Sequence, residues 1–404
     1  MHIPDGYLSP QTCVAAYAVA VPFWAVASNR VSKVVRTRNV PLLAILSAVS
    51  FLVMMFNVPI PDGTSAHAVG GTVIAVVLGP WAALIAVSVA LLFQALLFGD
   101  GGVLAYGANV VNMAVVLPFV GYAVYRLLAG RRSPLTSGRR VAAAAVAGYV
   151  AINASALAAA VEFGIQPDLF HTAAGAPLYS PYHLSQTIPA MMLAHLTVAG
   201  AAEAILTAGV LGYLARADVR RLVPSHPGVP VTAGETPAAP PRRFTPGRVA
   251  VGFVLLIVAL TPLGLLAPGG AFGEGAPEDI DLGRYGLNAV PSGLARYNGW
   301  WSHSVLNGYG FSAGQHPNLA YVLSAVVGIA VVGALVFALA KLVEVAVRRR
   351  QPDRAGLADA ADAAADAAAG AASADDAADA EAADAEAADA EAADAGDAGE
   401  PSRV

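Results

Sequence analysis

Cysteine, lysine and charge in general are scarce in this chain. Its single cysteine, Cys13, excludes a disulfide framework and a cysteine-rich zinc site. The two lysines, Lys33 and Lys341, stand in no Gly-Lys-Ser/Thr motif, so we predict that no nucleotide binds through a P-loop. Charged residues make up 13% of the 404 residues and hydrophobic residues 57%. Soluble domains carry about 25% charged residues, and these deficits therefore indicate a protein of the lipid bilayer.

Acidic residues are also few outside the C-terminal end. Fifteen of the 28 acidic residues follow Arg350, so residues 1–350 carry 21 basic and 13 acidic residues. The basic residues are scattered between apolar stretches, and we predict no nucleic acid partner. Residues 347–404 are rich in Ala, Asp and Glu and have almost no apolar bulk to bury. We predict a disordered acidic tail there.

Long apolar stretches predict an all-α, polytopic transmembrane fold. A helix needs about 20 residues to cross roughly 30 Å of hydrocarbon. Nine stretches qualify or come close, near residues 11–27, 40–60, 68–79, 81–98, 107–128, 141–163, 187–214, 249–268 and 319–346. Gly79-Pro80 separates the short third and fourth stretches. They are two short helices or a re-entrant pair, because proline interrupts helical hydrogen bonding.

The order of these stretches divides the chain into four parts. Residues 1–214 are predicted to form a transmembrane domain of six to seven helices. The linker 215–248 is Pro-rich and predicted to be extended. Residues 249–346 are predicted to form a two-helix hairpin with an external loop, and 347–404 is the tail.

Arginine predicts the orientation of a multi-pass protein of the cell membrane. Three segments are rich in basic residues: 28–39, 126–140 and 215–248. Three others contain neither Lys nor Arg: 61–67, 99–106 and 164–186. The positive-inside rule places the basic segments and the tail in the cytoplasm, and the N-terminus outside. The first ten residues contain no Lys or Arg, so we expect no cleavable signal peptide.

The first six residues, Met1-His2-Ile3-Pro4-Asp5-Gly6, carry the strongest chemical signal. The α-amine of Met1, the amide nitrogen of His2 and the His2 imidazole can close fused five- and six-membered chelate rings around one ion. Such rings favour a planar set of nitrogens, which suits Ni²⁺, Cu²⁺ or low-spin Co²⁺.

A fourth ligand is available at His67. Ile-Pro-Asp-Gly occurs at 3–6 and again at 60–63, and His67 follows the second copy. Pro-Asp-Gly favours a turn, and two such turns can fold both histidine-bearing segments into one site. The residues alone leave two other readings open. His2 can be an accident of the start of the chain, and His67 a polar residue at a membrane boundary.

The sequences MHIPDGYLSP (1–10) and GTSAHAVGG (63–71) resemble the CbiM/NikM family. Its members are the substrate-capture components of cobalt and nickel energy-coupling-factor transporters. GDGGVLAYGANVVNMA (99–114) and HLTVAGAAEAILTA (195–208) extend the resemblance over roughly residues 1–214. The hairpin at 249–346 resembles in topology the CbiN/NikN-type component, here fused.

This resemblance implies a site, a substrate and partners. Met1, His2 and His67 are expected to hold Ni²⁺ or Co²⁺ as the transported substrate. A transmembrane coupling protein and two ATP-binding subunits are expected partners, because this chain supplies no P-loop of its own.

Three polar residues within the apolar stretches are further candidates. Glu203 lies mid-helix with His195 two turns before it, and Asn112 lies in another span. An ionised group inside a bilayer costs at least about 2.5–3.5 kcal/mol, so Glu203 is expected to face a partner or a cavity. These residues either form interhelical hydrogen bonds or support a metal-bound histidine from behind.

The predicted activity is capture and uptake of a metal ion without catalysis. Affinity is expected to fall as pH drops, because the ligand nitrogens must lose protons. A stand-alone cation channel or secondary transporter is the alternative, but it would need charged residues paired across several spans. An intramembrane metalloenzyme is disfavoured because the chain has no His-Glu-x-x-His motif.

Overall fold

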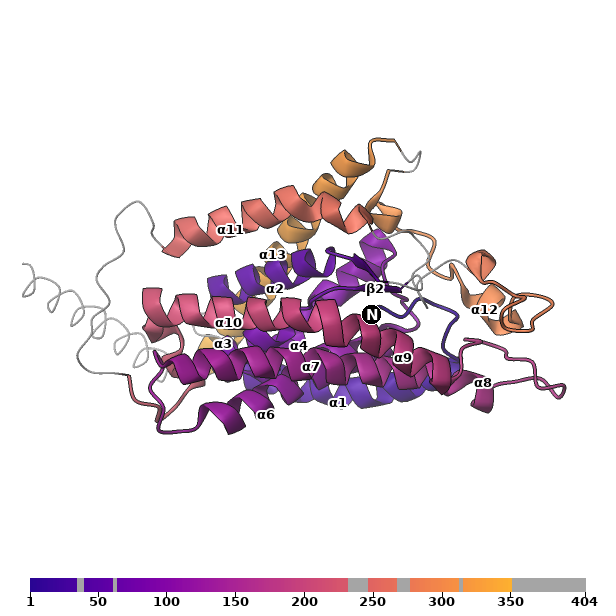
Figure 1. Ribbon diagram of the computed structural model, residues 1–404. Coiled ribbons are helices and arrows are strands. Elements are labelled where there is room, and N and C mark those ends of the chain that lie inside the picture. The colour runs from indigo at the N-terminus through magenta and orange to yellow at the C-terminus, as the bar shows by residue number, and fades with distance from the viewer. Residues whose placement is uncertain (35–39, 61–63, 232–245, 267–276, 312–314, 351–404) are drawn as a thin grey trace, which may run out of the picture. The chain divides into compact units, whose positions relative to one another are not determined.

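Membrane-spanning helices make up most of the fold (Figure 1). The computed structural model describes residues 1–34, 40–60, 64–231, 246–266, 277–311 and 315–350. Six helical stretches in these residues are long and apolar enough to cross a bilayer: Pro10–Val31, Pro80–Phe98, Tyr106–Ala129, Gly138–Leu169, Leu184–Ala217 and Pro317–Val343. Val40–Met54 and Val251–Leu265 are shorter apolar helices. The predicted all-α, polytopic fold is confirmed.

The first half of the chain contains most of the helices. Its α-helices and strands are α1 (Pro10–Val34), α2 (Val40–Met54), β1 (Val58–Ile60), β2 (Thr64–Ala66), α3 (Gly71–Leu78), α4 (Pro80–Phe93), α5 (Tyr106–Asn109), α6 (Leu117–Ala129), α7 (Gly138–Gly164), α8 (Gln166–Leu169), α9 (Leu184–Ala194) and α10 (Gly200–Ala217). Three π-helical segments extend or join them: η1 (Gln94–Phe98), η2 (Val110–Val116) and η3 (His195–Ala199).

The second half adds α11 (Pro246–Leu260), α12 (Ser292–Tyr297) and α13 (Pro317–Arg350), with short 3₁₀ turns between them. Residues Met1–Val343 form one compact unit. α13 packs on α2, because Gly328 lies against Phe51 and the Tyr321 hydroxyl donates to the carbonyl of Met55, the residue after α2, at 2.7 Å. The four-part division therefore stays a prediction, and the tail after residue 350 lies outside the described residues.

The short third apolar stretch becomes a helix too short to cross the bilayer. α3 has 8 residues, a length of about 12 Å at 1.5 Å per residue. Gly79 adopts φ 94° between α3 and α4, a conformation that glycine reaches without strain. Pro80 then begins α4, where its missing N–H costs no hydrogen bond. The structure has two consecutive helices here, and only the stretch Pro80–Phe98 has spanning length. Both predicted alternatives consist of two such helices, so the choice between them stays a prediction.

A small antiparallel hairpin precedes α3. β1 pairs with β2, with Val58 opposite Ala66 and Ile60 opposite Thr64. The predicted Pro-Asp-Gly turn at 61–63 lies outside the described residues. His67 follows β2 directly, so the hairpin fixes the position of the His67 backbone. Figure 1 shows the N-terminus beside β2.

Small residues allow α7 to lie close to α10. Ala144, Ala147 and Ala151 of α7 are fully buried. A Cβ added at Gly148 would lie 2.9 Å from the carbonyl oxygen of Glu203 in α10. Helices in membranes approach closely where such residues line the contact. This close packing fixes the position of Glu203 inside the helical unit.

Candidate metal site

The N-terminal residues are buried as an extended segment ahead of α1. Ile3 donates its backbone N–H to Asn109 Oδ1 at 2.8 Å, and Asn109 Nδ2 donates to the Ile3 carbonyl at 3.1 Å. The Gly102 N–H also donates to the Ile3 carbonyl, at 2.8 Å. These three bonds satisfy the backbone of Ile3 and fix the position of His2 before it.

The predicted turn at residues 3–6 is present and is held by Asp5. Gly6 has φ 91°, which favours glycine. The Asp5 carboxylate accepts the backbone N–H groups of Val103, Leu104 and Ala105 at 3.1, 2.8 and 3.1 Å. One buried carboxylate thus binds the loop before α5 to the N-terminal segment.

The two histidines meet at the buried N-terminus. The rings of His2 and His67 have centroids 5.0 Å apart and an interplanar angle of 21°. Met1, His2 and His67 are each no more than 4% exposed. The Nε2 atoms of both rings are buried and make no hydrogen bond with any described residue. The two rings are stacked in nearly parallel planes, and a buried imidazole nitrogen without a hydrogen-bond partner, such as Nε2 of His67, is suited to binding a metal ion.

Half of the predicted metal ligands are backbone nitrogens rather than side chains. Among the described residues, no group of three or more His, Cys, Asp and Glu side chains could hold a metal ion. The predicted ligand set needs only two imidazoles, because the other two nitrogens belong to the backbone at Met1 and His2. The structure brings all three predicted metal-binding residues together.

His67 is prepared to act as a neutral ligand. Its burial, and next the charge of the N-terminal amine, lower the pKa of His67 well below its usual value, and His2 and His195 lower it further. The imidazole is therefore deprotonated at neutral pH. Its Nδ1 lies 3.1 Å from the Ala68 carbonyl, which leaves Nε2 as the coordinating atom.

Glu203 holds the segment that carries His67. Its carboxylate accepts the backbone N–H groups of Val69 and Gly70 at 2.8 Å each, and that of Thr72 at 3.3 Å. These donors belong to the loop after His67 and to the first turn of α3, where N–H groups lack helical partners. Glu203 therefore positions His67 indirectly, through the backbone of residues 69–72.

The other two polar candidates lie next to the site in π-helical segments. η2 contains Asn112, whose amide donates to Glu162 Oε2 at 2.6 Å. The Asn112 carbonyl accepts from Ser155, which also contacts the Met1 sulfur at 3.5 Å. η3 begins at His195, whose Nδ1 lies 2.8 Å from the Met191 carbonyl. π-Helical turns are rare and often occur at functional sites.

Asp100 is a site residue that the sequence analysis missed. His2 Nδ1 lies 3.2 Å from Asp100 Oδ1. Asp100 also accepts a hydrogen bond from Tyr309, which belongs to the predicted hairpin module. Burial raises the pKa of Tyr309 well above its usual value, so this hydroxyl keeps its proton and donates. An acidic residue in a segment without bases, 99–106, was the available signal.

Gly102 lies directly against the N-terminal segment, so a substitution there tests how closely this segment must fit. A Cβ at Gly102 would lie within 2.5 Å of the Asp5 backbone nitrogen and would overlap its carboxylate. We expect Gly102→Ala to displace residues 1–6 and to weaken metal binding at least about tenfold, as loss of ligand support does. Isothermal titration with Ni²⁺ measures this. Gly138→Ala is the control, since a Cβ there meets nothing within 4 Å; equal affinities for the two variants would contradict the expectation.

Fold and site together define a polytopic membrane protein that buries its own N-terminus beside two histidines. Residues 2–221 match the family described as the cobalt uptake substrate-specific transmembrane region. The chain belongs to this CbiM/NikM family.

Relatives that match more than the first 221 residues extend this result. The chain is 48% identical over 346 residues to the fused nickel transport protein NikMN of Rhodobacter capsulatus, covering 83% of this chain and 95% of the relative. It is 43% identical over 334 residues to a probable fused nickel transport protein, LarMN, of Lactiplantibacillus plantarum, covering 81% and 94%. A crystal structure of a truncated transition metal transporter is 57% identical, with a TM-score of 0.50, covering 53% of this chain and 98% of that one. The predicted fusion is confirmed.

Proposed function

We propose that this protein binds Ni²⁺ or Co²⁺ outside the cytoplasm and mediates its uptake as the substrate-specific component of an energy-coupling-factor transporter. The observation that carries the proposal is the burial of the N-terminus with the paired rings of His2 and His67. The α-amine, the His2 amide nitrogen and the two imidazoles supply four nitrogens, which suits these two ions. The names of the two fused relatives favour nickel.

The contact between His2 and Asp100 affects how the ion binds. Only Nδ1 of His2 can close a six-membered ring with the His2 amide nitrogen, and Nδ1 lies 3.2 Å from Asp100. The ion and Asp100 therefore compete for one nitrogen. Breaking a hydrogen bond to a charged group costs about 1.5–3 kcal/mol. Two unit charges 4 Å apart attract by about 4 kcal/mol at an effective dielectric constant of about 20.

Because the cargo ion carries two charges, attraction by Asp100 outweighs its competition. We expect Asp100→Asn to weaken Ni²⁺ binding at least about tenfold, the size of effect seen when support of a metal ligand is removed. Asp168→Asn is the control, since Asp168 also lies 3.2 Å from a histidine, His183, but at an exposed position. Equilibrium dialysis compares them, and tighter binding by Asp100→Asn would contradict this view.

Energy for uptake is proposed to come from other chains. This chain has no Gly-Lys-Ser/Thr motif, and a coupling protein with two ATP-binding subunits would supply the driving force. We infer from the basic segments 28–39, 126–140 and 215–248 that the N-terminal site opens to the outside. Proton competition at the amine and amide nitrogens makes capture weaker at low pH.

Radiolabelled ⁶³Ni uptake into cells or proteoliposomes tests the proposed function. We expect ATP-dependent uptake with the three partner subunits present and none with an ATPase-inactive subunit. Equal uptake by this chain alone would support the alternative, a stand-alone channel or secondary transporter. The same assay with ⁵⁷Co compares the two ions.

A further inference from the structure

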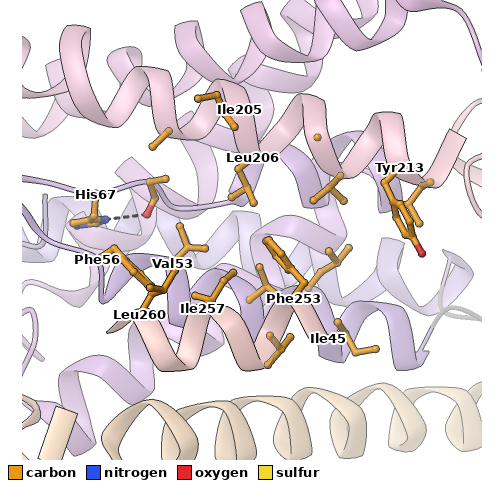
Figure 2. A pocket seen from close by; sticks show the side chains of 18 of the residues that line it. Ile45, Val53, Phe56, His67, Ile205, Leu206, Tyr213, Phe253, Ile257 and Leu260 are labelled. Carbon is orange, nitrogen blue, oxygen red and sulfur yellow. Dashed lines mark hydrogen bonds between the residues drawn. The ribbon is translucent and has the colours of Figure 1, made fainter. Parts of the chain in front are cut away.

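A long apolar cavity lies between α2, α10 and α11 (Figure 2). Its volume is about 800 Å³, within the roughly 300–1,000 Å³ of ligand pockets. Its walls are formed almost entirely by aliphatic and aromatic side chains, such as Ile45, Leu206, Phe253 and Ile257. These helices belong to the membrane part of the chain, so hydrocarbon is the solvent that surrounds the cavity.

The cavity has the length of a lipid chain. Along η3 and α10 it extends from Val198 to Leu214, which is about 24 Å at 1.5 Å per residue. This length exceeds half of the roughly 30 Å hydrocarbon thickness. Figure 2 shows His67, Phe56 and Leu260 at one end and Tyr213 with Ile45 at the other.

The end near Tyr213 carries a hydroxyl group and a basic side chain. The Tyr213 hydroxyl is buried and makes no hydrogen bond within the described part of the chain. Arg221 lines the same cavity and is the only charged residue among the described residues that does so. Its Nε donates to Asp218 at 2.7 Å, and its terminal nitrogens make no hydrogen bond to another described residue, so they can bind an anion. Arg216 and Arg220 stand nearby in the sequence.

We propose that this cavity binds one anionic phospholipid of the bilayer. An acyl chain lies along the apolar walls, and the phosphate accepts from the Tyr213 hydroxyl and the Arg221 guanidinium. The charge and shape of the cavity match this lipid. Its basic end suits an anionic head group, and its uncharged walls suit an acyl chain, as in lipid sites between membrane helices. The bound lipid fills the space between α11 and the pair α2 and α10, and so joins the second half of the chain to the first.

Filling the cavity with protein tests the proposal. Gly209 lines the cavity, and a Cβ added there meets nothing within 4 Å. We expect Gly209→Leu in the full chain to lose the phosphatidylglycerol that native mass spectrometry detects on the wild type. Gly252→Leu is the matched control, since a Cβ at this α11 position also meets nothing and the residue does not line the cavity. Thermal unfolding verifies that both variants are folded.

Head-group recognition is tested separately. We expect Tyr213→Phe and Arg221→Gln each to weaken phosphatidylglycerol binding about tenfold, equivalent to one lost hydrogen bond to a charged group. Phosphatidylcholine should bind more weakly than phosphatidylglycerol to the wild type. The proposal is overturned if Gly209→Leu retains the lipid, or if the two lipids bind equally.

A crosslinking experiment tests the occupant directly. The proposal is also overturned if a photo-crosslinker at position 209 in the assembled transporter captures a partner's helix instead of lipid. Metal is absent from all these measurements, so they do not depend on whether the N-terminal site binds an ion.

Discussion

A chain extended by four Gly and Ser residues ahead of Met1 is expected to lose stoichiometric Ni²⁺ binding. The extension converts the α-amine of Met1 into an amide and so removes one of four proposed ligands. It also cannot be accommodated, because Met1 is 2% exposed and Ile3 is held by Asn109 and Gly102. Metal content of the purified protein measures the effect.

Removal of the extension provides the control for this experiment. A protease site placed directly before Met1 regenerates the natural amine without changing any other residue. We expect cleavage to restore one Ni²⁺ per protein. Full binding by the uncleaved protein would exclude the amine from the site, while His2 and His67 would remain candidates.

Glu203→Ala is expected to have the second large effect, on stability and on metal binding together. The substitution leaves the buried N–H groups of Val69, Gly70 and Thr72 without their acceptor. Each orphaned buried donor costs about 1–3 kcal/mol, and the loop that carries His67 loses its anchor. We expect a clearly lower unfolding temperature in detergent and loss of measurable Ni²⁺ affinity.

Glu162→Ala is the matched control for Glu203→Ala. Glu162 also lies on a membrane helix, but its carboxylate accepts one side-chain hydrogen bond, from Asn112. Its removal is expected to cost less stability and to leave His67 in place. If the two variants unfold at the same temperature and bind Ni²⁺ equally, Glu203 does not hold the His67 loop.

Much of the fold was predictable because bilayer crossing leaves a plain pattern in hydropathy. Each of the nine predicted stretches contains a helix, and the turn at Asp5-Gly6 follows from local residue chemistry. The repeated Ile-Pro-Asp-Gly led to the prediction that His2 and His67 share a site, and their rings are stacked in the structure. The second turn on which that prediction relied lies outside the described residues. What hydropathy could not give is helix type, because the π-helical turns at Gln94, Asn112 and His195 depend on packing.

The supporting residues of the site were not predictable for a related reason. Asn109 holds Ile3 across 106 positions, and Tyr309 reaches Asp100 across 209. No local pattern encodes such contacts, since each partner looks like an ordinary polar residue at the end of a helix. Glu203 was singled out because a carboxylate inside an apolar span is costly, but its partners proved to be backbone N–H groups of the loop beside His67.

X-ray absorption at the nickel K-edge of the purified, Ni²⁺-loaded protein tests the central claim most directly. The site formed by the N-terminus, His2 and His67 predicts four nitrogen neighbours in a plane, with scattering from two imidazole rings. A six-coordinate spectrum dominated by oxygen, or a spectrum with no imidazole contribution, would contradict it.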